Sequence, residues 1–271
     1  MTHEGQYDNM NAFFRTNGYD EVFSQEDYPV DKVVNSFGVQ DDFLYDYAIP
    51  VLNQRAATGQ PFFATLLSIS NHPPYVIPPF FHPKTSEPET QIVEYADWAL
   101  RQFFEEARKQ PWFDNTIFVL EGDHGKLVGD AECELPESYN HIPLMIYSSR
   151  IQPEEKTTFG GQVDIQPTIL GLLNIDYLQN NFGVDLLKEE RPCMFYTADN
   201  MVVGRNDTLL YLYNYETQQE LTYDIGNGKL NAVPMDDSFL PLKEYSFSML
   251  QSAEFLVKHG KTLNSIPFTQ Q

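Results

Sequence analysis

The stretch FVLEGDHGK, residues 118–126, places an acid and a histidine side by side at the end of an apolar run. Asp123 and His124 lie between Gly122 and Gly125, and glycine tolerates the backbone angles of a sharp turn. If the chain turns there, a carboxylate oxygen and an imidazole nitrogen face one point, which suits a divalent ion such as zinc or manganese. An Asp–His hydrogen bond within a loop also fits these residues, and the short stretch by itself leaves both interpretations open.

Two further histidines flank segments that are predicted to be strands. His72 follows a strand predicted over residues 61–70, and His141 directly precedes one predicted over 142–149. Because ligands of open parallel sheets bind outside the carboxyl ends of the strands, His72 is a candidate site residue. His141 is a second candidate because it also flanks a strand end. The alternative for each is a loop or core histidine whose nitrogens are satisfied by hydrogen bonds.

The elements that must position these side chains follow from the apolar pattern. Short apolar or β-branched runs predict buried strands over residues 61–70, 116–123 and 142–149. Between the first two, residues 91–110 carry the stripe of an amphipathic helix, formed by Ile92, Ala96, Ala99, Phe103 and Ala107. Strand, helix and strand in this order predict a parallel crossover.

The second half of the chain predicts two helices and a hairpin. One helix is expected near residues 163–175, with Asp164 as its N-cap and Pro167 in its first turn. Residues 208–216 and 220–229 are predicted to pair as a hairpin. Residues 246–260 are predicted to form a closing helix, with Gly260 just beyond its end. The fold class is therefore α/β with a partly antiparallel tail.

Charge and cysteine content exclude some classes of protein. The 271 residues include 17 Lys and Arg against 39 Asp and Glu, a formal net charge of −22. Such a surface repels phosphate backbones, so no nucleic-acid partner is expected. Cys133 and Cys193 form no CxxC pair, which excludes a cysteine zinc site and leaves one disulfide open. The apolar runs are too short to span a bilayer, and the polar first ten residues are no signal peptide.

Several segments together resemble a known superfamily. Residues 95–125, 139–149 and 163–175 are similar to the alkaline-phosphatase/sulfatase superfamily, in which an Asp-His pair after a core strand binds the catalytic metal. Residues 11–23, 37–50 and 62–75 resemble its branch of lipoteichoic acid synthases and related phosphoglycerol transferases.

The resemblance implies a fold and a division of the chain. The expected fold is an alkaline-phosphatase-like sandwich, with a mostly parallel central sheet and a C-terminal antiparallel subregion. Residues 1–271 would form the C-terminal part of a sulfatase-like catalytic domain. Its core would cover about residues 1–200, and its closing hairpin and helix about residues 201–271.

The resemblance also implies roles for individual residues. Asp123 and His124 are expected to bind one divalent metal: manganese, magnesium or zinc. His72, in SNHPPY, matches a histidine that contacts the substrate phosphate or glycerol. His3 falls where the branch carries another headgroup-binding histidine, although the nearby tryptophan and arginine of the branch are not matched. His141 is expected near the metal.

The nucleophile of the superfamily, a threonine or a formylglycine, precedes the region that matches His3. Only Met1 and Thr2 precede it here. We therefore expect the nucleophile upstream of this chain, and the chain to be part of a longer enzyme held at the bacterial membrane by upstream helices, with its catalytic domain facing outward. The substrate would be a phosphodiester linked to a lipid or glycan. A complete protein that has lost catalysis is the competing explanation.

Two other functions remain open from the sequence. A sulfatase would carry a Cys/Ser-x-Pro-x-Arg motif, which neither Cys133 nor Cys193 fits. A noncatalytic sensing or binding module with the same fold would use the acidic surface to contact a partner. Neither the donor, the acceptor nor the oligomeric state follows from the sequence.

Overall fold

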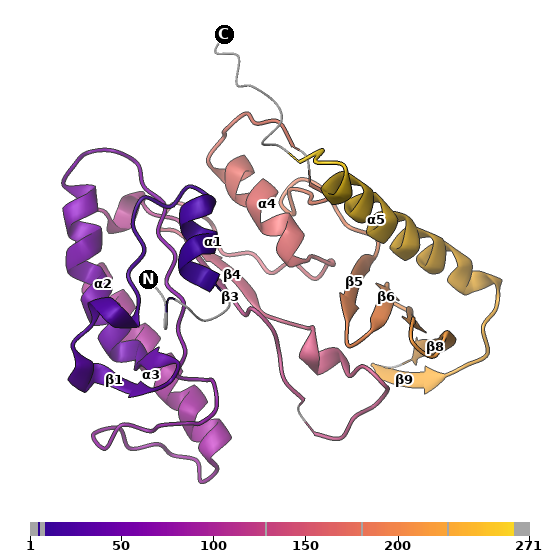
Figure 1. The fold of residues 1–271 in the computed structure, drawn as a ribbon, viewed down its shortest axis with the longest axis horizontal. Coiled ribbons are helices and arrows are strands. Elements are labelled where there is room, and N and C mark those ends of the chain that lie inside the picture. Colours follow the sequence, from indigo (N-terminus) through magenta and orange to yellow (C-terminus); the bar gives the residue numbers. More distant parts are fainter. Residues whose placement is uncertain (1–4, 6–8, 128, 180, 227, 263–271) are drawn as a thin grey trace. The chain divides into compact units, whose positions relative to one another are not determined.

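The structure, a computed structural model, describes residues 5, 9–127, 129–179, 181–226 and 228–262 (Figure 1). It divides into two compact units. The first contains residues 1–119 and 146–151, and the second contains residues 120–145 and 152–271. Each unit is described by itself.

The chain contains both helices and strands, as an α/β fold requires. The α-helices are α1 (Met10–Thr16), α2 (Asp41–Ala56), α3 (Pro88–Ala107), α4 (Ile165–Leu172) and α5 (Leu240–Lys258). The strands are β1 (Val33–Asn35), β2 (Gly38–Val39), β3 (Phe118–Glu121), β4 (Leu144–Tyr147), β5 (Met194–Ala198), β6 (Met201–Arg205), β7 (Leu209–Asn214), β8 (Gln219–Gly226) and β9 (Lys229–Ala232). Short 3-10 turns connect several of them.

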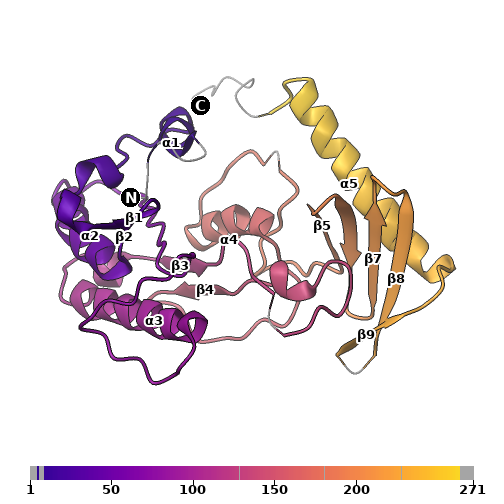
Figure 2. The same cartoon turned by 60° about the horizontal axis from the view of Figure 1, so that its bottom comes forward.

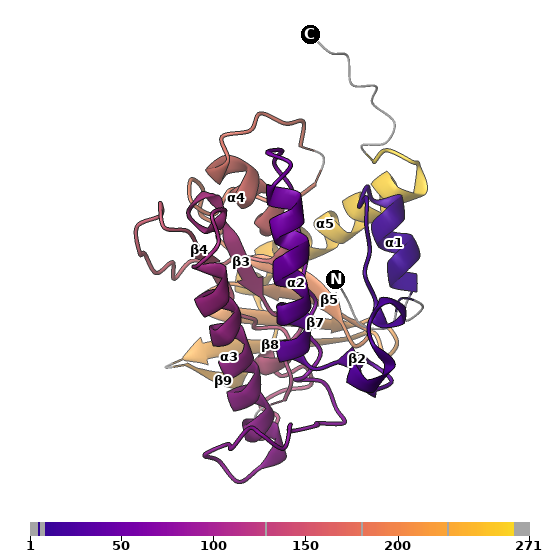
Figure 3. The same cartoon turned by 90° about the vertical axis from the view of Figure 1, so that its left-hand side faces the viewer.

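The first unit is built on the pair α2 and α3, which lie side by side (Figures 1 and 3). The predicted helix over residues 91–110 is confirmed as α3, and most of its apolar stripe is buried. Phe103 and Ala107 of that stripe pack with Ala48 and Leu52 of α2 in one hydrophobic cluster. Residues spaced by four lie on one face of a helix, so the two stripes meet along their length.

The predicted strand over residues 61–70 is wrong. Residues 61–69 have no regular secondary structure, and Phe63 keeps 73% of its surface exposed. A strand needs a neighbour that accepts and donates its backbone hydrogen bonds. No strand in the described ranges pairs with this segment. The apolar run therefore has the composition of a strand, but no neighbouring strand in the described ranges to form its backbone hydrogen bonds.

The other two predicted strands are confirmed as β3 and β4, which pair in a two-stranded sheet. Their predicted burial is wrong, because the side chains of both are half-buried or exposed. Met145, for instance, keeps 55% of its surface exposed. Strands buried on both faces need cover on both, and this sheet lacks it within the described residues.

The second unit carries a five-stranded antiparallel sheet in the order β5-β6-β7-β8-β9. The predicted hairpin is confirmed as β7 and β8, and the sequence missed β5, β6 and β9. Side chains of a strand alternate between its two faces. Leu210 and Leu212 of β7 accordingly enter one hydrophobic cluster, whereas Tyr211 between them packs with Phe239 and Leu242 at the start of α5. Helix α5 lies alongside this sheet (Figure 2).

Both predicted helices of the second unit are present. α4 begins directly after Asp164 and has Pro167 in its first turn, as expected. α5 begins at Leu240, six residues before the predicted start, and Gly260 beyond its end adopts a φ of +60°. Both cysteines are free thiols. No helix within the described ranges has the length and apolar character needed to cross a bilayer.

Candidate functional site

Asp123 and His124 lie in the turn that leaves β3, in the second unit. The carboxylate Oδ2 of Asp123 and the imidazole Nε2 of His124 are 3.9 Å apart. Their side chains are 76% and 70% exposed, respectively. Burial, followed by the charge of Asp123, raises the pKa of the neighbouring Glu121. The two side chains thus face each other at the surface, open to a ligand from solvent.

The remaining polar atoms of the pair are occupied by the backbone. The backbone N–H of His124 donates to Oδ1 of Asp123 at 2.9 Å. Nδ1 of His124 lies 2.7 Å from the carbonyl of Gly125, a contact that places the proton on Nδ1. Oδ2 and Nε2 are consequently the atoms left facing each other. A backbone carbonyl on Nδ1 is the usual way in which a metal-binding histidine is oriented.

Four hydrogen bonds with distant parts of the chain fix the backbone of this turn. The N–H of Gly122 donates to the carbonyl of Pro143 at 3.3 Å, and that of Gly125 to the carbonyl of Tyr139 at 2.9 Å. The side-chain amide of Gln162 donates to the carbonyls of Gly122 (3.3 Å) and Asp123 (3.0 Å). The turn is therefore held on both sides of the Asp-His pair.

Only glycine fits at position 125. A Cβ there would lie 2.0 Å from the backbone oxygen of Ser138, far inside contact distance. From the sequence, this glycine is expected to supply the backbone freedom of a sharp turn. The structure instead requires it for the close approach of residues 138–139, which receive its N–H.

A buried ion pair holds the chain two residues after Gln162. Asp164, two residues on, is fully buried and accepts the N–H of Gly161 at 2.8 Å. Its carboxylate also accepts from Nε of Arg191 at 3.0 Å and from the N–H of Val184 at 2.8 Å. The sequence predicted Asp164 as a helix cap only. It missed Gln162 and Arg191, because nothing local to GGQVDIQPT indicates contacts with residues 122–123 or 191.

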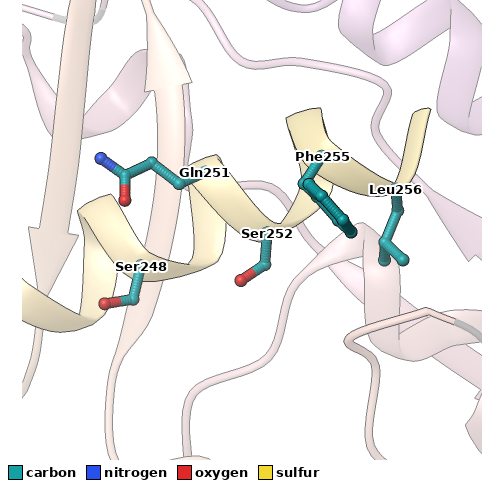
Figure 4. A pocket seen from close by; sticks show the side chains of 5 residues that line it. All are labelled: Ser248, Gln251, Ser252, Phe255 and Leu256. Atoms are coloured by element: carbon teal, nitrogen blue, oxygen red, sulfur yellow. The ribbon is translucent and has the colours of Figure 1, made fainter. Parts of the chain in front are cut away.

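We expect Gln162→Ala to weaken divalent-metal binding about tenfold, because outer partners of this kind typically contribute ten- to a hundredfold to affinity. Manganese titration of the variant measures the change. Gln251→Ala on α5 is the matched control, because none of the residues that line the same surface hollow as Gln251 has an ionisable side chain that could bind metal. It lines this hollow of about 490 Å³ together with Ser248, Ser252, Phe255 and Leu256 (Figure 4). Equal affinities of the two variants would contradict a role for Gln162.

The loop after the pair is anchored on the antiparallel sheet. Leu135 is 2% exposed and packs in the cluster of Met201, Val203, Leu210, Leu212 and Tyr223. Beside it, Glu134 accepts the hydroxyl of Tyr223 and Glu137 pairs with Arg205. The carbonyl that receives the Gly125 N–H, that of Tyr139, belongs to this anchored segment.

Leu135→Ala should lower the free energy of unfolding by about 2–5 kcal/mol, through lost burial and the cavity left behind. Urea denaturation followed by circular dichroism measures it. Leu127→Ala in the same loop is the control, and it should change stability by about 0.5 kcal/mol or less, because Leu127 is exposed. A loss below about 1 kcal/mol for Leu135→Ala would mean that the loop is not anchored by this side chain.

The pair suits a divalent metal in the kind and spacing of its donors. Metal–ligand bonds of about 2.0–2.2 Å at tetrahedral angles separate neighbouring ligand atoms by about 3.3–3.6 Å. The separation of 3.9 Å between Oδ2 and Nε2 comes close to this range. Two donors are half of such a set, and the described part of the chain contains no group of three His, Cys, Asp or Glu residues able to hold a metal.

The other predicted site residues are distributed over the chain. His141 lies in the second unit and is exposed, and its N–H donates to the carbonyl of Glu137 at 2.8 Å. His72 lies in the first unit, exposed at the end of the 61–70 segment. His3 lies outside the described residues. That His72 and His141 approach the Asp-His pair remains a prediction.

Comparison with known proteins places these observations in a family. The family model described as Sulfatase matches residues 2–175. Lipoteichoic acid synthase 1 of Bacillus subtilis (strain 168) is 27% identical over 243 residues, which cover 82% of this chain and 36% of that protein. The chain spans about a third of the length of the curated relatives it matches.

Two solved structures share the fold. An alkaline phosphatase superfamily protein from Vibrio parahaemolyticus superposes with a TM-score of 0.81 at 27% identity, over 93% of this chain and 64% of that one. The lipoteichoic acid synthase LtaP from Listeria monocytogenes gives 0.79 at 22% identity, over 100% and 70%. These matches confirm the predicted alkaline-phosphatase-like α/β fold with its antiparallel C-terminal subregion. With more than half of its residues matched by the sulfatase model, the chain belongs to the sulfatase family.

Proposed function

We propose that this chain is the C-terminal part of a metal-dependent phosphoglycerol transferase or phosphodiesterase that acts on phosphodiesters linked to lipids or glycans. The observation that carries the proposal is the orientation of Asp123 and His124. Oδ2 of Asp123 faces Nε2 of His124, and the backbone holds Oδ1 and Nδ1. The likeness to lipoteichoic acid synthases supports a phosphodiester in place of a sulfate ester as the substrate.

Each predicted site residue has a role in this proposal. Asp123 and His124 hold one divalent cation, which is manganese, magnesium or zinc and which polarises the phosphoryl group when bound. His72 orients the phosphate or glycerol of the substrate, and His3 contributes to the same headgroup site. His141 lies near the cation. The nucleophile comes from the polypeptide upstream of residue 1, and residues 1–200 and 201–271 form the core and the closing subregion of the domain.

The proposed place of the protein follows from its substrate. Lipid-linked phosphodiesters lie at the cell surface, so the domain would face outward from a bacterial envelope, held by membrane helices upstream of this chain. A net charge of −22 keeps such a domain off an anionic membrane surface. The upstream helices would therefore supply the attachment.

The test is an activity assay on the natural full-length protein and on the 271-residue chain. With manganese, the full-length protein should hydrolyse a fluorogenic phosphodiester and leave the matching sulfate ester unchanged. The isolated 271 residues should be inactive. Turnover by the isolated chain would disprove the upstream nucleophile, and preferential cleavage of the sulfate ester would identify a sulfatase instead.

A further inference from the structure

The turn that carries His72 is tied to a buried carboxylate. Asp41, the first residue of α2, is 2% exposed. Its Oδ1 accepts the backbone N–H groups of Ile69 at 3.1 Å and Ser70 at 2.9 Å. No salt bridge in the described ranges involves Asp41. Burial raises the pKa of Asp41, and the hydrogen bonds from Ser70 and Ile69 act against this rise.

The contact is reciprocal and extends along the turn. Oγ of Ser70 accepts the N–H of Asp41 at 3.0 Å and donates to the side chain of Gln40 at 2.9 Å. The amide of Gln40 in turn donates to the carbonyl of Val76 at 2.7 Å. Gln40 and Asp41 thus bind three backbone groups on either side of His72: the N–H groups of Ile69 and Ser70 and the carbonyl of Val76.

His72 itself is fixed in backbone and ring. Its N–H donates to the carbonyl of Ile69 at 2.9 Å, the same residue whose N–H is bound by Asp41. Its Nδ1 lies 2.7 Å from the carbonyl of Pro73. The ring of Phe37, four residues before Asp41, lies against the imidazole with centroids 4.0 Å apart. Nε2 remains as the ring nitrogen free of these contacts.

We propose that Asp41 is a positioning residue that sets the orientation of His72, with Phe37 as the surface on which the imidazole rests. This inference rests on the proposed function, because the contact of His72 with substrate is itself a proposal. A helix cap needs a side-chain oxygen for its own helix's N–H groups. Asp41 instead directs its oxygen to the backbone of residues 69–70, two positions before the histidine.

The experiment is NMR of the 271-residue chain with labelled histidine, in which only six residues give ring signals. The His72 signal, assigned by its absence in His72→Ala, should be shifted upfield by the Phe37 ring. Asp41→Ala should remove most of this shift. Asp41→Asn should retain it, because the amide oxygen can still accept both N–H groups. Asp46→Ala on the same helix is the control and should leave it unchanged.

A second variant covers the case in which Asp41→Ala does not fold. Asp41→Ser suits the start of a helix but is too short to bridge both N–H groups, so it too should lose the shift. A His72 signal unchanged in a folded Asp41→Ala or Asp41→Ser would overturn the proposal. Whichever of the two variants folds, retention of the upfield His72 shift in it decides against the proposal.

A binding arm separates this inference from the proposed function. Affinity for glycerol phosphate should fall about tenfold in Asp41→Ala and stay within about twofold in Asp41→Asn, because displacement of a contact group by about 1 Å is already costly. If His72→Ala binds glycerol phosphate as well as the unaltered chain, the substrate role of His72 fails. The spectroscopic result would still decide whether Asp41 positions the ring.

Discussion

Asp123→Ala should abolish divalent-metal binding and reduce the manganese-dependent activity of the full-length protein by about a thousandfold or more. Loss of one of two facing donors leaves His124 as a lone surface imidazole, and metal-assisted charge stabilisation contributes several kcal/mol to such reactions. Calorimetric titration with manganese and zinc measures binding, and the fluorogenic phosphodiester assay measures activity.

The design of this test uses the exposure of the pair. Because Asp123 is 76% exposed, its removal should leave the circular dichroism spectrum and the unfolding midpoint unchanged. Asp207→Ala is the matched control, because Asp207 is also an aspartate in an exposed loop of the same unit. This variant should bind metal as before. His124→Ala should match Asp123→Ala, and the double variant should add little, since both act through one ion. Unchanged binding in Asp123→Ala would favour the noncatalytic module.

Asp164→Ala is expected to have the largest effect on stability, a loss of about 3–5 kcal/mol in the free energy of unfolding. The substitution leaves the guanidinium of Arg191 buried without its carboxylate, and it also removes the acceptor for the N–H groups of Gly161 and Val184. Arg191 would retain the carbonyl of Phe182 and the hydroxyl of Tyr245, which are neutral partners. Urea denaturation measures the loss.

Two further variants make this result specific. Glu254→Ala removes an exposed ion pair with Lys258 on α5 and should change stability by about 0.5 kcal/mol or less. Asp164→Leu combined with Arg191→Met removes both charges and should recover part of the loss. A cost below about 1 kcal/mol for Asp164→Ala would show that the pair is not a main support of the 161–164 turn.

Predictions from the sequence succeeded where the signal was local. The stripe of α3 and the hairpin of β7 and β8 follow from side-chain periodicity, which depends only on neighbouring residues. They failed for residues 61–69, whose apolar composition matched a strand. A strand is defined by a partner as much as by its own residues, and composition carries no information about the partner.

The candidate site shows the same division. Adjacency of Asp123 and His124, with glycine on either side, was enough to predict that their side chains lie together, because neighbours in a tight turn have little room to separate. The superfamily resemblance was likewise readable from order and spacing. The atoms that face each other depend on Nδ1 meeting the carbonyl of Gly125, which only the folded turn reveals.

The sequence by itself determined the family, the α/β class and the residues that carry the proposed chemistry. The tertiary structure alone decided what holds those residues: Gln162 on the carbonyl of Asp123, 39 positions away, and Asp41 on the backbone before His72, 28 and 29 positions away. The physical reason is that these are bonds from a side chain to a distant backbone group. Any residue offers the same N–H and C=O, so the identity of the partner depends on the path of the chain and leaves no mark in the local sequence.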